Sequence, residues 1–155
     1  MQLMYSEKGD TWPKVLKYNS EKYGDTRRAL RQKHHGIWQP YTWKDYYLSV
    51  KSLALGLISL GLKAGDRVLI VGDNAPQWYY AELAVQAGHA VAVGAYSDLT
   101  PGEIRYLAEN SEAAYAIVQD QEQVDKLLEV KDALPLLKKV LFWSYKGLAT
   151  TRILA

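Results

Sequence analysis

The second half of the chain alternates short, continuously apolar runs with segments of helical periodicity. The apolar runs fall at residues 68–71, 91–95, 115–118 and 140–143, and the helical segments between them at 76–87, 101–109 and 121–130. Short strands that are apolar at every position are typical of parallel sheets covered on both faces. The alternation therefore predicts an α/β fold with a mostly parallel sheet and helices on both faces.

The N-terminal part of the sequence predicts a helix followed by a strand pair. The helix is expected to begin at Thr11 and to stop at Gly24, a residue type that ends helices. Two short strands should then meet at a turn formed by His35 and Gly36. Pro40 places the second strand at an edge, because proline cannot donate a backbone hydrogen bond.

Two capping boxes mark the starts of later helices. Thr42 with Asp45, and Thr100 with Glu103, follow the pattern of a hydroxyl, two residues and an acid. The remaining carboxylates are interpreted as capping and surface residues: Glu109, Glu112, Asp120 and Glu122.

Composition excludes several classes of function. The chain has 155 residues, a net charge of +2 and no cysteine, so it has no disulfides or thiol chemistry. The small net charge argues against a nucleic-acid partner. With no signal peptide or apolar stretch of membrane-spanning length, we expect no transmembrane segment and a cytoplasmic protein.

The junction at residues 67–78 has the form of a phosphate-binding strand–helix turn but lacks its glycines. Gly72 is its single glycine, and neither the dinucleotide fingerprint nor the P-loop occurs in the chain. A structural role is therefore favoured over phosphate binding, with Asn74 as a helix cap or turn residue and Pro76 in the first helical turn.

Other catalytic or metal-binding patterns are weak. His34 and His35 are neighbours in an expected strand and should point to opposite faces, so no metal site is predicted. Ser97 lies beside Asp98 after an expected strand, but no nucleophile-elbow motif surrounds it.

The order of motifs nevertheless resembles the opening part of the AMP-forming acyl-CoA synthetases, the adenylate-forming enzyme superfamily. The matching positions are Tyr41-Thr42-Trp43, then Leu60, Gly61, Gly65, Asp66, Arg67 and Val68, then Asn74, Pro76 and Trp78, and finally Ala87, Gly88, Val91 and Val93. The stretch from Val93 to Asp98 is similar to the bacterial long-chain fatty acyl branch. The resemblance thus points to a long-chain fatty-acid–CoA ligase.

This resemblance implies ATP, Mg²⁺ and coenzyme A as cofactors of a full-length parent, with a fatty acid as substrate. The family's phosphate loop, its Tyr-x-Glu motif and its catalytic lysine have no counterpart in this sequence, so no catalytic residue and no cofactor are assigned to the chain itself. Residues 1–155 are interpreted as an incomplete N-terminal subdomain fragment, matched over 10–143, with a tail at 144–155.

Three residues are the candidates for substrate contact in the parent: Asn74, Tyr96 and Asp98. Each is expected where a strand ends, at the sheet edge where α/β proteins bind ligands. We expect the isolated chain to be inactive, to pair with the missing remainder, and to self-associate through exposed apolar surface. The alternatives are a free-standing α/β interaction or small-ligand-binding module and a Rossmann-type oxidoreductase, although the latter lacks its glycine fingerprint.

Overall fold

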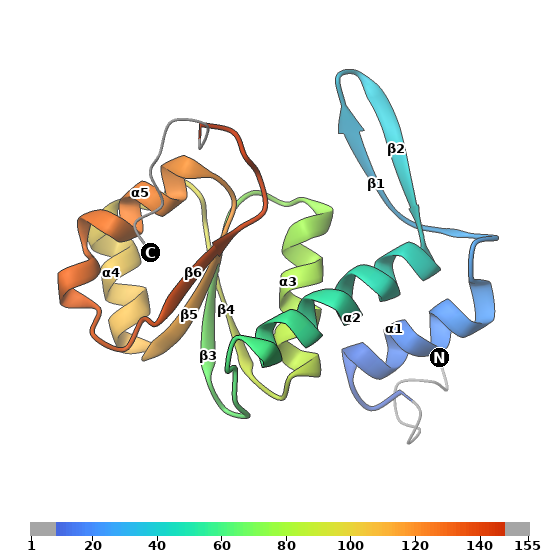
Figure 1. Ribbon diagram of the computed structural model, residues 1–155. Helices are drawn as coiled ribbons and strands as arrows, with labels where there is room; N and C mark the ends of the chain where they lie inside the picture. The colour runs from blue at the N-terminus through green and yellow to red at the C-terminus, as the bar shows by residue number, and fades with distance from the viewer. Residues whose placement is uncertain (1–8, 148–155) are drawn as a thin grey trace. The chain divides into compact units, whose positions relative to one another are not determined.

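The computed structural model describes residues 9–147, which form two compact units (Figure 1). The first, called here the helical unit, comprises the described residues up to 64 together with 75–89. The second, called the sheet unit, comprises 65–74 and the described residues from 90 onward.

The helical unit contains three helices and a strand pair: α1 (Trp12–Tyr23), β1 (Arg28–His34), β2 (Ile37–Thr42), α2 (Trp43–Ser59) and α3 (Pro76–Ala87). The strands are antiparallel, and Pro40 lies opposite Arg31 in this isolated two-stranded ladder. Helices α1, α2 and α3 pack against one another, with Leu16, Val50 and Leu57 among their buried side chains. The hairpin turn lies at the end farthest from α1 and α2 (Figure 1).

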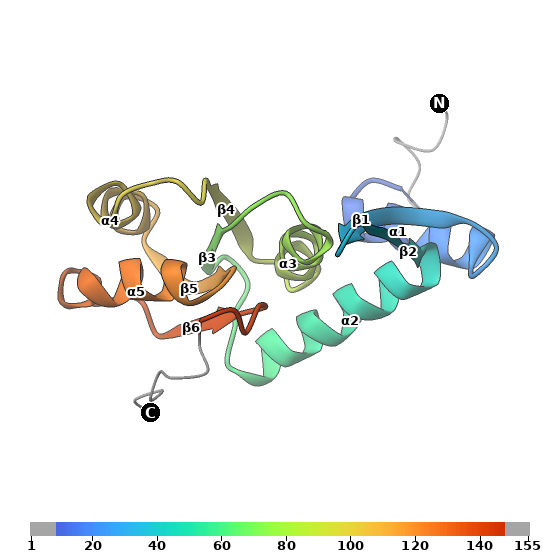
Figure 2. The same ribbon diagram turned by 90° about the horizontal axis from the view of Figure 1, so that it is seen from above.

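The sheet unit contains four parallel strands and two helices: β3 (Arg67–Val71), β4 (Val91–Ala95), α4 (Pro101–Asn110), β5 (Ala113–Val118), α5 (Gln121–Glu129) and β6 (Lys139–Phe142), with a 3₁₀ turn at Lys131–Ala133. The spatial strand order is β4-β3-β5-β6. Both helices lie on the same face of the sheet (Figure 2).

The core of the sheet unit is built from that helix-covered face. Leu69, Val71 and Val118 belong to the same buried apolar cluster as Ile104 of α4 and Leu127 of α5. Full burial of a side chain of this size contributes about 1.5–3 kcal/mol. Apolar burial between the sheet and its helices therefore holds this unit together.

The predicted α/β class, the parallel sheet and the separate strand pair are confirmed, with small differences at element ends. The strand expected at 115–118 begins at Ala113, the strand expected at 140–143 is Lys139–Phe142, and the helix expected at 121–130 ends at Glu129. All six residues of β5 are buried. Part of the tail, residues 148–155, lies outside the described residues.

Both predicted capping boxes form. The Thr42 hydroxyl accepts from the backbone N–H of Asp45, and the Thr100 hydroxyl accepts from that of Glu103, with the reciprocal bonds present in both boxes. Thr11 occupies the N-cap of α1 without a side-chain cap bond. Within 9–147, no helix has the length and apolar character needed to cross a membrane.

Candidate functional site

The connections between strands reverse direction across the sheet between β3 and β5, which makes the carboxyl ends of these two strands a topological switch point. The chain passes from β3 to β4 on one side, and then from β4 to β5 on the other side of β3. Ligands of open α/β sheets bind in the crevice outside such a reversal. The candidate site therefore consists of the segments that leave the strands there, which we call the carboxyl edge: residues 72–74, 96–98, 119–120 and 143–144.

A polar network joins three of these segments at Asp73. One carboxylate oxygen of Asp73 accepts from the Ser97 hydroxyl at 2.6 Å, and the other accepts from Gln119 Nε2 at 3.2 Å. Gln119 Oε1 accepts in turn from the Asp73 backbone N–H at 2.6 Å. These side-chain bonds, that from Ser97 foremost, lower the pKa of Asp73 from its ordinary value of 3.8. The network fixes the ends of β3, β4 and β5 relative to one another.

Two side chains of helix α5 bond to the same network at Ser97. The Ser97 carbonyl oxygen accepts from Gln123 Nε2 at 3.1 Å and from Lys126 Nζ at 2.7 Å. Lys126 also forms an ion pair with Glu122 at 3.0 Å and is only 16% exposed at its side chain. Its charge is therefore engaged within the unit.

Two buried acceptors lie at the start of α5. Asp120 is 7% exposed and Gln123 is 3% exposed, and Asp120 Oδ1 and Gln123 Oε1 have no hydrogen-bond partner among the described residues. Asp120 occupies the N-cap position but makes no side-chain cap bond. Asp120 was expected to be a capping or surface residue; it takes the N-cap position, but its side chain is buried.

Gly72 is required by close packing against Trp143. A Cβ atom built on Gly72 would lie 2.6 Å from two ring carbons of Trp143 and 3.0 Å from the Gln119 Cβ. Real Cβ atoms essentially never approach another heavy atom within 3.0 Å, so the Trp143 ring or the Gly72 backbone would have to shift. At the junction of residues 67–78, the missing side chain of Gly72 therefore leaves space for the ring of Trp143, which follows β6.

The three predicted substrate-contact residues all lie at the carboxyl edge. Asn74 follows Asp73 in an exposed bend, and Tyr96 and Asp98 flank Ser97, with Tyr96 79% exposed. Asn74 does not cap α3, because Ala75 occupies the N-cap position. The sequence analysis missed Asp73, Gln119 and Trp143, and only the placement of Asp73 after an apolar strand could have indicated one of them.

The Asp73 carboxylate and the Lys126 ammonium at the carboxyl edge both have partners within the sheet unit. Both oxygens of Asp73 accept hydrogen bonds from neighbouring side chains, and Lys126 is held by Ser97 and Glu122. Across residues 9–147, no group of three histidine or acidic side chains is placed to hold a metal ion. The edge also carries the carboxyl group of Asp98 and the exposed ring of Tyr96.

The histidine pair differs from its predicted arrangement. His35 lies in the hairpin turn with a φ of 47°, and its ring contacts that of His34 at a centroid distance of 4.2 Å. The expectation that the two side chains point to opposite faces was therefore wrong, because His35 has left the extended conformation.

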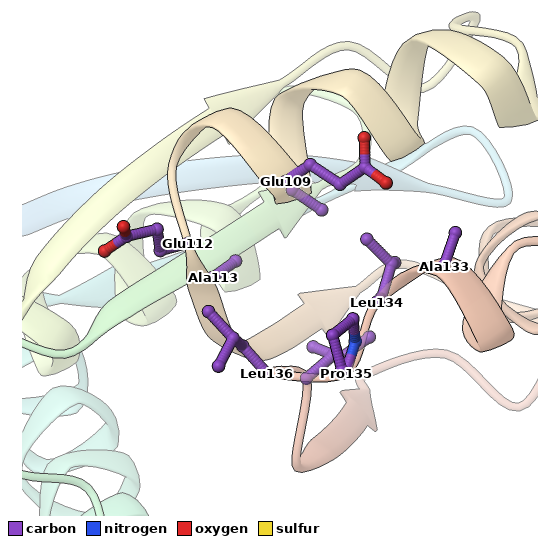
Figure 3. A pocket seen from close by; sticks show the side chains of 9 residues that line it. Glu109, Glu112, Ala113, Ala133, Leu134, Pro135 and Leu136 are labelled. Atoms are coloured by element: carbon purple, nitrogen blue, oxygen red, sulfur yellow. The ribbon is translucent and has the colours of Figure 1, made fainter.

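A shallow pocket of about 230 Å³ lies at the opposite, amino end of β5 (Figure 3). Leu134, Pro135 and Leu136 form one wall, and Glu109 and Glu112 lie near the rim. Both glutamates are engaged, Glu109 with Arg105 at 2.9 Å and Glu112 with Arg67. Since ligands of open α/β sheets bind at the carboxyl ends of strands, this pocket is not the candidate site.

Comparison with known proteins identifies the fold and its relatives. The model of the family described as AMP-binding enzyme matches residues 16–154. A long-chain-fatty-acid–CoA ligase, ACSBG2 of Xenopus laevis, is 36% identical over 120 residues, which cover 77% of this chain and 16% of that protein. The ACSBG1 ligase of Bos taurus is 31% identical over 123 residues, covering 79% of this chain and 17% of the relative.

Among solved structures, a putative long-chain-fatty-acid CoA ligase from Rhodopseudomonas palustris superimposes with a TM-score of 0.75 at 24% identity. The match covers 86% of this chain and 33% of that one. This likeness concerns the fold alone. In each of these comparisons the chain spans a third or less of the longer protein.

Proposed function

Because this chain belongs to the AMP-binding enzyme family, we propose that it serves as the N-terminal scaffold portion of a long-chain fatty-acid–CoA ligase. Such a ligase joins a fatty acid to coenzyme A while ATP is converted to AMP and pyrophosphate. The two curated relatives named above carry this activity in their names. In this proposal the complete enzyme acts in the cytoplasm and uses ATP, Mg²⁺ and coenzyme A.

The observation that supports this proposal is that Asp73 and Lys126, at the carboxyl edge, have their bonding partners within the sheet unit. Asp73, Ser97 and Gln119 bond to one another, and Lys126 is bonded to Ser97 and Glu122. Groups that are satisfied internally hold the strand ends in place, and the reacting groups would then come from the remainder of the enzyme. The isolated chain is accordingly inactive.

The test is ATP–pyrophosphate exchange in the presence of a long-chain fatty acid. The 155-residue chain alone should give no exchange above the protein-free blank, with the full-length Xenopus laevis relative as the positive control. Mixing the chain with that relative lacking its matched segment should restore exchange, because the scaffold would then be supplied in trans. Exchange by the isolated chain would contradict the proposal.

The proposed contact residues are tested in the same complemented enzyme. Tyr96→Ala should reduce exchange or raise the KM for the fatty acid, because Tyr96 is an exposed aromatic group at the carboxyl edge. Tyr106→Ala is the matched control, since Tyr106 is also exposed, at 65%, but lies on α4. Equal effects of the two substitutions on exchange would show that Tyr96 is not a substrate-contact residue. Asn74→Ala and Asp98→Ala complete the series.

A further inference from the structure

The hairpin of β1 and β2 is the most basic exposed segment of the helical unit. From residue 26 to residue 41 the sequence contains no aspartate or glutamate. The same stretch contains four permanent cations: Arg27, Arg28, Arg31 and Lys33. The hairpin therefore carries a local excess of positive charge that the net charge of the whole chain conceals.

Exposed apolar side chains accompany these cations. Trp38 is 55% exposed and is paired with Lys33 across the ladder, and Ile37 next to the turn is 66% exposed. The Arg31 guanidinium lies 5.2 Å from the centre of the Trp38 ring, a cation–π distance. Arg31, Lys33 and Trp38 share one face of the strand pair, because alternate residues of a strand point the same way.

The base of the hairpin is anchored, whereas its far end is not. Tyr41 makes an edge-to-face contact with Tyr80 of α3 in the same unit, at a centroid distance of 6.4 Å. Leu30 is half-buried near this base. A solvated strand edge would account for the exposed arginines, but it would not account for the exposed Trp38 and Ile37 near the turn.

We propose that this hairpin docks on an anionic lipid surface. Basic residues near such a surface are attracted by its negative potential, and tryptophan favours the headgroup level of a bilayer. Ile37 pairs with His34 and so lies on the other face from Trp38, but its place beside the turn would bring it to the boundary of the acyl chains when the end of the hairpin docks. The phosphates of a nucleic acid could also pair with the cations, but they would not bury the exposed Ile37 side chain. An anionic lipid surface is therefore the favoured partner.

This inference goes beyond the proposed ligase function and does not depend on it, because the test measures binding rather than catalysis. The 155-residue chain is mixed with vesicles of phosphatidylcholine containing phosphatidylserine, and bound protein is separated by flotation. Binding should occur, should weaken with added salt, and should be far weaker on vesicles of phosphatidylcholine alone.

Two variants locate the contact. Arg31→Gln with Lys33→Gln should weaken binding about thirtyfold, at about 1 kcal/mol for each cation near the surface. Ile37→Ser with Trp38→Ser should weaken it without altering its salt dependence. The matched control, Lys17→Gln with Lys51→Gln, removes the same charge from exposed positions on α1 and α2. It should bind as tightly as the unsubstituted 155-residue chain.

Three outcomes would overturn the proposal: no binding to the anionic vesicles, equal loss in the control and hairpin variants, or hairpin-dependent binding to an oligonucleotide with none to vesicles. Circular dichroism of each variant establishes that the helices are retained, so that a loss of binding reports on the hairpin surface.

Discussion

At the scale of single residues, Gly72 has a packing role, in line with the structural role that its sequence context favoured over phosphate binding. A lone glycine after an apolar strand invites comparison with phosphate-binding turns. In the structure its missing side chain leaves room for the Trp143 ring. The absence of a Cβ thus serves a packing contact between β3 and the segment after β6, and this contact helps to shape the carboxyl edge.

Gly72→Ala should lower the free energy of unfolding by about 1–3 kcal/mol, as overpacking of a rigid site does. Gly102→Ala is the matched control, because a Cβ there meets nothing within 4 Å. In helix α4 that control should leave stability unchanged or raise it by up to about 1 kcal/mol. Urea denaturation measures the free energy of unfolding of both variants. A similar change in the two variants would mean that the Trp143 ring can move aside at little cost.

At the scale of elements, the capping box of α4 links helix stability to pH. Hydrogen bonds from the Thr100 backbone N–H, and then from its hydroxyl, lower the pKa of Glu103 from its ordinary value of 4.5. A lowered pKa means that the folded state favours the charged form. The contribution of Glu103 is therefore present above pH 4.5 and is lost as the pH falls through the lower folded value.

Thr100→Ala should cost about 1 kcal/mol of stability at neutral pH, the usual cost of losing an N-cap. The difference from the unsubstituted chain should narrow in acid, as the pH falls below 4.5 through the lowered pKa of Glu103 and this carboxylate becomes protonated. Thr11→Ala is the control, since Thr11 is an N-cap residue without a side-chain cap bond and its loss should be nearly neutral. Chemical denaturation at the two pH values measures these differences, and a pH-independent cost at Thr100 would rule out the coupling to Glu103.

At the scale of the whole molecule, we predict that exposed apolar side chains lead to self-association. Helix α2 exposes Leu48, Leu55 and Ile58 at 47–58%. Clusters of such groups recruit partners when they form a continuous patch. Light scattering should therefore show a mass that rises with concentration, and Leu48→Gln with Leu55→Gln should shift the chain toward the monomer. A monomer mass at every concentration would contradict this prediction.

Sequence reasoning located most elements of the fold because their signals are local. The start of α2 follows from Thr42 and Asp45, three residues apart, and its burial pattern from apolar residues on a helical period. The candidate site was predicted less completely. Asn74, Tyr96 and Asp98 could be assigned to strand ends, but nothing near Gln119 indicated that it would bond to Asp73, 46 residues away.

The amino-acid sequence alone determined the strand–helix alternation, both capping boxes and the resemblance to the adenylate-forming enzymes, because each rests on neighbouring residues or on their order. The tertiary structure decided the strand order, the Asp73 network, the burial of Asp120 and the role of Gly72. Ser97 and Asp73 are 24 residues apart, and they meet because β4 pairs with β3. Contacts of this kind depend on which strands become neighbours, and apolar periodicity carries no information about that choice.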